Sequence, residues 1–242
     1  MKRLPIVTLL VLCLSLGCSH PQRHEYKVVN HALAMGDSTV YGLVCDGSND
    51  SIVIFLPDPY DGSDPDTLDV LEASSRHQVF GSLRIGDKVA MLRNVEDSTK
   101  ADIVIVTQDL LGQWCFKVKP TLRRRAGMED MTQLPDSVKA LLNEEREYAI
   151  VLKSDSVAQS VGGRNGMARF EDESPVEYPR MKRYRQWYIR NGLLMLAPAV
   201  TDSLANTPPS DTVKLVRLDA DTLVLRFSDG EHSFYRKKVA QE

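Results

Sequence analysis

The residue with the clearest chemical role in this chain is Cys18. Lys2 and Arg3 precede an apolar run from Leu4 to Leu16, and small Gly17 separates that run from the cysteine. This order is typical of a secretory signal peptide: basic residues, then a short apolar run, then a small residue before the cleavage site. The apolar run is shorter than the roughly 20 residues of a membrane-spanning helix. The segment therefore predicts an exported chain whose new N-terminal thiol at Cys18 is available for modification.

The four residues Ser15-Leu16-Gly17-Cys18 resemble the cleavage box of bacterial lipoproteins, with Ser15 at a position where leucine is usual. The resemblance implies a signal peptide over residues 1–17, a lipid on the thiol of Cys18, and a polar tether over residues 18–25. It implies a Gram-negative cell envelope location, with the protein anchored in the outer membrane. The alternative is an ordinary signal peptide followed by an incidental cysteine.

Composition limits the classes of partner. The chain has 30 basic and 33 acidic residues, and loss of residues 1–17 leaves 28 basic residues and a formal charge of −5. That balance argues against nucleic acid, and against an anionic membrane surface, as the main partner. Without a later apolar run of membrane length, we expect the lipid on Cys18 to be the membrane anchor.

Other residues with chemical potential do not form a recognisable reactive site. The acidic loop residues do not have the spacing of an EF-hand, and the histidines lack metal-ligand spacing. The chain has no Gly-x-Ser-x-Gly elbow. We therefore predict no metal, no cofactor and no enzymatic activity. Cys45 and Cys115 are interpreted as two buried thiols, with a disulfide between them as the alternative.

The elements that would position any site are short strands separated by turn residues. Over residues 26–107 the predicted strands are Ser38–Cys45, Ser51–Leu56, Thr67–Glu72, Lys88–Arg93 and Asp102–Thr107. Several short strands at this spacing predict a small closed β-domain, an OB-like or SH3-like barrel. Residues 108–111 are predicted to be the whole linker to a second domain.

A second run of strands is predicted over residues 109–238, with one helix over residues 134–145. The predicted strands are Gln113–Lys119, Tyr148–Lys153, Ser156–Val161, Ala168–Glu171, Lys182–Arg190, Leu193–Ala197, Thr212–Asp219, Thr222–Phe227 and His232–Lys237. Asn191-Gly192 is a strong hairpin signal because both residues tolerate positive φ. The fold class is therefore all-β, with two antiparallel β domains and one helix.

The motif Leu111-Gly112-Gln113-Trp114 resembles the Gly-x-Trp signature of the lipocalin family. The succession from Gln186 to Leu196 and from Ser210 to Leu225 is similar to the lipocalin-like domain of Gram-negative surface lipoproteins. The resemblance implies an up-and-down barrel in which Gly112 and Trp114 close one end. It also implies a basic side chain from the last strand over the Trp114 ring, with Arg236 as the first choice and Arg226 as the second.

Two functions follow as alternatives. The first is binding of a small apolar or amphipathic ligand inside the second barrel, with Phe116, Tyr148, Phe170 and Trp187 as candidate contacts. The second is a filled barrel that serves as a protein-interaction module, an accessory or inhibitor lipoprotein of an envelope complex. The two differ in the lumen: interlocked side chains without a void would leave the ligand no site.

Two local questions stay open from the sequence. The alternation at Trp187 and Ile189 against Gln186 and Tyr188 does not show which pair faces the lumen. Residues 123–125 are three consecutive arginines in the first loop after the Trp114 strand. They form either an attractor for an anionic headgroup or a solvated loop.

Overall fold

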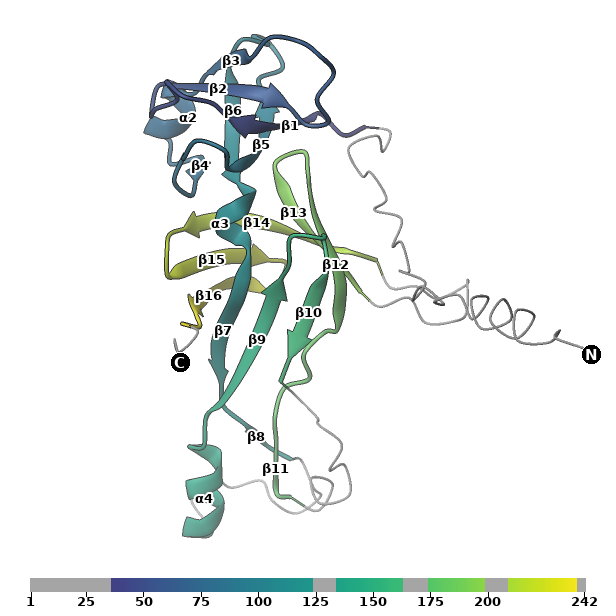
Figure 1. Cartoon of the computed structure of the whole chain (residues 1–242). Helices are drawn as coiled ribbons and strands as arrows, with labels where there is room; N and C mark the ends of the chain where they lie inside the picture. The colour runs from purple at the N-terminus through teal and green to yellow at the C-terminus, as the bar shows by residue number, and fades with distance from the viewer. Residues whose placement is uncertain (1–35, 124–133, 163–173, 199–208, 239–242) are drawn as a thin grey trace, which may run out of the picture.

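Short runs of β-branched and aliphatic residues form two β-sheets that lie one above the other in Figure 1. The structure is a computed structural model, and it describes residues 36–123, 134–162, 174–198 and 209–238. The predicted all-β class is confirmed. None of the helices in the described ranges is long and apolar enough to span a membrane.

The first sheet has six strands in the order β3-β2-β1-β5-β6-β4. Its strands are β1 (Thr39–Val44), β2 (Ile52–Pro57), β3 (Asp66–Asp69), β4 (Val79–Phe80), β5 (Lys88–Arg93) and β6 (Ala101–Val106). The sheet is mixed and not purely antiparallel, because β4 runs parallel to β6. The short helix α2 (Leu71–Ser75) begins where the predicted third strand was expected to continue.

This sheet curls into a barrel. Asp69 at the end of β3 forms a parallel bridge with Lys100, and its N–H donates to the Thr99 carbonyl at 2.9 Å. The end of β3 therefore meets the start of β6. This arrangement is that of an OB-fold, a partly open Greek-key barrel. Its interior is the hydrophobic cluster of Val44, Val53, Phe55, Leu68, Val70, Val89, Met91, Ala101, Val104 and Val106. We call residues 39–106 the small barrel.

The second sheet has eight antiparallel strands in the order β10-β9-β7-β16-β15-β14-β13-β12. They are β7 (Gly112–Val118), β9 (Arg146–Leu152), β10 (Ala158–Val161), β12 (Tyr184–Arg190), β13 (Leu193–Pro198), β14 (Asp211–Leu218), β15 (Thr222–Phe227) and β16 (Gly230–Arg236). The last strand, β16, pairs with the first, β7. The sheet is an up-and-down meander, as the lipocalin-like expectation requires, and we call it the large barrel.

The large barrel closes between β10 and β12 with fewer backbone bonds than elsewhere. Val157 and Gln186 form an isolated antiparallel bridge, and the Trp187 N–H donates to the Ser156 carbonyl at 2.9 Å. The Ser160 hydroxyl donates to the Lys182 carbonyl at 2.7 Å. These contacts complete the ring of strands.

Local turn and helix predictions are confirmed where the structure describes them. Asn191 and Gly192 form the β12–β13 turn with φ of 49° and 71°. Helix α4 (Asp136–Leu142) lies beyond the end of the large barrel, beside the two-stranded pair β8 (Thr121–Leu122) and β11 (Val176–Glu177) (Figure 1). Leu134, Val138 and Val176 form a small separate core there. The predicted strand Ala168–Glu171 lies outside the described residues.

The two barrels share one hydrophobic core. Residues 108–111, predicted as a bare linker, include most of a helical turn, α3 (Thr107–Leu110). Register places Tyr41, Ala90, Ile105 and Phe80 in one row across β1, β5, β6 and β4. This row is on the outer face of the small barrel, and its members pack into the same cluster as the large-barrel core. The small barrel therefore covers one end of the large barrel.

A polar clip accompanies this apolar contact. The Asn191 side chain accepts from the Ser38 N–H at 2.8 Å and donates to the Gly36 carbonyl at 2.9 Å. The Asn191 backbone N–H donates to the Thr39 hydroxyl at 2.7 Å, and the Tyr41 hydroxyl donates to the Ile189 carbonyl at 2.6 Å. The β12–β13 turn is therefore bonded to the first described residues of the chain.

Replacement of Asn191 tests how much this clip contributes. Asn191→Gly keeps the positive φ of the turn but loses both side-chain bonds, and we expect it to lower the free energy of unfolding by about 1–2 kcal/mol. Asn191→Ala loses the same bonds and is also strained at positive φ, at a further cost of about 1 kcal/mol. Urea unfolding of both variants measures these changes. Equal stability of the two variants and the wild type would show that the Asn191 side chain does not stabilise the junction of the barrels.

Candidate functional site

The covered end of the large barrel is built around Trp114. This side chain is fully buried, and its indole N–H donates to the Leu110 carbonyl at 2.7 Å. The guanidinium carbon of Arg236, from the last strand, lies 4.1 Å from the centroid of the Trp114 ring. The two residues therefore form a cation–π pair between a buried ring and a half-buried cation.

Arg236 also ties together three segments of backbone. Its Nε donates to the Ala220 carbonyl at 2.6 Å, and its Nη2 donates to the Asp109 carbonyl at 2.6 Å, while Nη1 donates to the Leu111 carbonyl. Burial lowers the pKa of Arg236, and the nearby carboxylates of Asp109 and Asp221 oppose that shift. An arginine stays charged under such conditions, so the cation persists against the ring.

Gly112 is required by this geometry. Its φ is 129°, and a Cβ at this position would lie 2.7 Å from the Arg236 Nη1 atom. A larger residue would therefore displace the guanidinium as well as strain the backbone. Gly112, Trp114 and Arg236 meet at one point, whereas Arg226 lies on an exposed face in an ion pair with Glu231.

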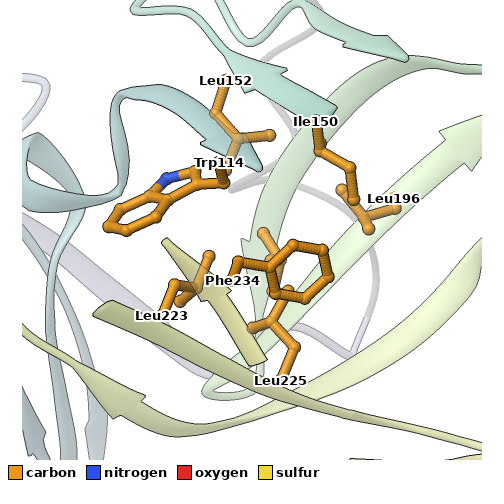
Figure 2. Close-up of a pocket in the computed structure, with 8 residues that line it drawn as sticks. Trp114, Ile150, Leu152, Leu196, Leu223, Leu225 and Phe234 are labelled. Atoms are coloured by element: carbon orange, nitrogen blue, oxygen red, sulfur yellow. The ribbon is translucent and has the colours of Figure 1, made fainter. Parts of the chain in front are cut away.

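The lumen beyond Trp114 is filled by apolar side chains. Figure 2 shows them converging from several strands on a common centre: Trp114, Ile150, Leu152, Leu194, Leu196, Leu223, Leu225 and Phe234. They leave a cavity of about 10 Å³, close to the space of one water molecule, and its lining presents no polar atom. Among the described residues, the lumen beyond Trp114 is a packed core.

Farther along β7, the interior continues as an aromatic cluster. The Phe116 ring packs edge-on against Phe234 with centroids 5.1 Å apart and against Tyr148 at 5.9 Å. The Tyr148 hydroxyl donates to the Pro179 carbonyl at 3.0 Å. Phe116 and Tyr148, both candidate ligand contacts, are therefore used to pack against protein atoms.

Trp187 faces the interior from another part of the wall. Trp187 and Ile189 are buried, while Gln186 is exposed, which resolves the alternation that the sequence left open. The Trp187 indole N–H donates to the Lys153 carbonyl at 2.9 Å. Phe170, the fourth candidate contact, lies outside the described residues, as does Cys18.

A register shift between Tyr184 and Gln186 brings Tyr184 into the same interior. Its hydroxyl donates to the Asp211 carboxylate at 2.6 Å, and burial together with this bond raises the Tyr184 pKa above its ordinary value. Asp211 also forms an ion pair with Lys182, whose ammonium nitrogen lies 2.7 Å from the carboxylate. These polar groups are paired with each other, so they do not form a free binding site.

The remaining reactive groups are dispersed. Cys45 is half-buried in the small barrel and Cys115 is buried on β7, and both are free thiols. Burial raises the pKa of Cys115, which keeps it a weak nucleophile. Within the described ranges, no group of three His, Cys, Asp or Glu residues is arranged to hold a metal ion.

Described residues of the acidic loop (residues 58–69) and of the triple arginine (residues 123–125) form ion pairs or hydrogen bonds with other parts of the protein. Asp58 pairs with Lys88 at 3.2 Å, and Asp66 forms an ion pair with Arg93. The Arg123 N–H donates to the Pro175 carbonyl at 2.8 Å, and its side chain lies 3.8 Å from Glu177. Arg124 and Arg125 lie outside the described residues.

The sequence did not predict one group of polar side chains on the outer face of the large barrel. Glu147 accepts from the Tyr235 hydroxyl and from the Lys237 ammonium, both at 2.6 Å. These bonds lower the pKa of Glu147, raise that of Lys237, and raise that of Tyr235 to about 12. The strand register, which brings β16 and β9 to either side of β7, was needed to find this group.

Comparison with known proteins gives little further information. No protein-family model matches the chain, and no curated protein matches it. Among solved structures, a crystal structure of a lipocalin-like protein from Bacteroides thetaiotaomicron matches with 19% identity and a TM-score of 0.29. The match covers 53% of this chain and 97% of that protein.

Arg236→Met tests the closed end. The variant loses the cation over Trp114 and leaves three carbonyls without their donor, so we expect the free energy of unfolding to fall by about 3 kcal/mol. Arg226→Met is the matched control, because its exposed pair with Glu231 contributes less than about 1 kcal/mol. Denaturant unfolding measures both, and an equal loss in the two variants would contradict a special role for Arg236.

Glu147→Gln tests the outer-face group by pH. The folded-state pKa of Glu147 is lower than its ordinary value of 4.5, so its contribution to stability is present above pH 4.5 and is lost as pH falls through the folded pKa. We expect the wild type to lose stability over this acidic range more steeply than Glu147→Gln. Thermal unfolding at a series of pH values measures the difference, and parallel curves would contradict the assignment.

Proposed function

We propose that this protein is a lipid-anchored protein of the bacterial cell envelope that works by binding another protein. In this proposal the large barrel is a rigid support and the small barrel presents the binding surface. The observation that carries the proposal is the filled lumen around Trp114, Leu196 and Phe234. The residues described offer no catalytic site.

Cavity size is the physical basis for this choice. Ligand pockets usually enclose about 300–1,000 Å³, and they place a few polar groups against an apolar wall. The lumen has about 10 Å³ and a wholly apolar lining. To admit a ligand, several of the large buried side chains would have to leave a packed core, at a cost of several kcal/mol for each.

The small barrel differs from the large barrel in charge. Residues 39–106 contain 12 acidic and 5 basic residues, a formal charge of −7, whereas residues 111–238 contain 17 acidic and 21 basic residues, a charge of +4. The overall charge of −3 conceals this separation. A strongly acidic surface favours a partner that presents basic residues, and it accelerates their encounter.

The small barrel also has an apolar outer face. Val53 and Phe55 point into its core, so alternation places Ile52, Ile54 and Leu56 on the opposite side, where they are half-buried. Leu43 on β1 pairs with Leu56 on this face. An apolar centre within an acidic surface has the composition of a protein-binding patch.

The anchor in this proposal is the expected lipid on Cys18. Its support is the sequence Ser15-Leu16-Gly17-Cys18 and the apolar run before it. Export and anchoring would bring the small barrel to partners at the envelope surface. They require no further membrane element.

A second candidate function is binding of a small apolar or amphipathic ligand, with which a lipocalin-like fold is consistent. The observation in its favour is Phe116, which is only partly buried beside Tyr148 and Phe234 at the edge of the lumen. A ligand at this position would lie against the aromatic cluster and outside the packed core.

Native mass spectrometry of the mature chain carrying Cys18→Ser decides between the two candidates. We expect the mass of the polypeptide alone and no thermal shift with lipids, tetrapyrroles or bile-type amphiphiles, because the lumen has no space for them. Leu225→Ala is the positive control: it opens a cavity at the lumen, which should admit a small apolar probe such as benzene. A co-purified apolar molecule in the wild type would overturn the proposal.

A further inference from the structure

A run of positive charge on one strand is not used by the proposed function. Residues 178–201 contain five basic residues and no acidic residue, although the chain as a whole is acidic. The basic residues are Arg180, Lys182, Arg183, Arg185 and Arg190. They belong to β12 and to the segment that leads into it.

The fold exposes this charge. Tyr184 points into the large barrel, so its neighbours Arg183 and Arg185 both point outward, and Arg180 is also exposed. Within the described ranges, the side chains of these three arginines form no hydrogen bond and no ion pair. Many other exposed basic residues are paired, as Lys88 is with Asp58 at 3.2 Å.

The exposed residues continue along the outer face of β12. Gln186 and Tyr188 follow Arg185 on this face, and Tyr188 lies across from Met195 on β13. We call Arg183, Arg185, Gln186, Tyr188 and Arg190 the β12 strip. It combines cations with an aromatic residue, a composition suited to the headgroup region of a bilayer.

The beginning of the described chain is fixed beside this strip. Gly36 is bonded to Asn191 at the end of β12, and a Cβ on Gly36 would lie 3.7 Å from the Arg190 guanidinium. Residues 18–36 can extend for at most about 65 Å. A lipid on Cys18 would therefore attach the molecule to the membrane from a point beside the β12 strip, which allows that side to face the bilayer.

The charge separation between the barrels favours the same orientation. An anionic surface repels the small barrel, with its charge of −7, and attracts the basic strand of the large barrel. We propose that the β12 strip docks on anionic lipid headgroups and so turns the acidic small barrel away from the membrane. This inference stands whether or not the lumen binds a ligand.

The expected strength is modest. Each basic residue near an anionic surface increases membrane partitioning about fivefold, so two arginines account for roughly 25-fold. Such an attraction does not hold a protein by itself; with the expected lipid on Cys18 as the anchor, it selects the side of the protein that faces the membrane.

Co-sedimentation with vesicles tests the proposal on the mature chain carrying Cys18→Ser. We expect binding to vesicles that contain phosphatidylglycerol, little binding to pure phosphatidylcholine, and loss of binding as salt is raised. Arg183→Glu with Arg185→Glu should lower the partition coefficient at least about 20-fold. Thermal unfolding shows that each variant is folded.

The matched control is Lys214→Glu with Arg217→Glu, on the outer face of β14. It makes the same change in net charge at a different place, so binding should fall much less than in the β12 variant. Equal losses in the two variants would attribute binding to net charge and overturn the proposal. Failure of the wild type to bind phosphatidylglycerol vesicles at low salt would also overturn it.

Discussion

The contact on which the rest of the fold depends is that between the Arg236 guanidinium and the Trp114 ring. Trp114 is on the first strand of the large barrel and Arg236 is on the last, so their contact, 4.1 Å from cation to centroid, joins the two ends of the meander. The same guanidinium donates to carbonyls of Asp109 and Leu111, at the junction with the small barrel. One cation therefore closes one barrel and fixes its connection to the other.

That closure shapes the functional interpretation. With Trp114 at one end and the small barrel packed over it, the interior is sealed there, and leucines from β13 and β15 fill what remains. A sealed and filled barrel is stiff, and stiffness suits a support more than a carrier. The proposed binding surface is therefore on the outside, where the charges of the two barrels are opposite in sign.

Much of the local structure was predictable. Strand alternation, the Asn191-Gly192 turn and helix α4 follow from rules that act over a few residues. The pairing of Trp114 with Arg236 came from a family resemblance, because 121 intervening residues carry no local signal of it. Helices α2 and α3 were missed, since four or five residues are too few to show helical periodicity.

The amino-acid sequence by itself determined the all-β class, the meander of strands near the end of the chain, the turn at Asn191 and the separation of charge, because each depends on neighbouring residues or on composition alone. Only the tertiary structure decided that Trp187 points inward and that Tyr41 and Ile105 face the large barrel. It alone decided that described side chains fill the lumen beyond Trp114. The reason is that free volume depends on side chains from eight strands together, and register determines which of them meet.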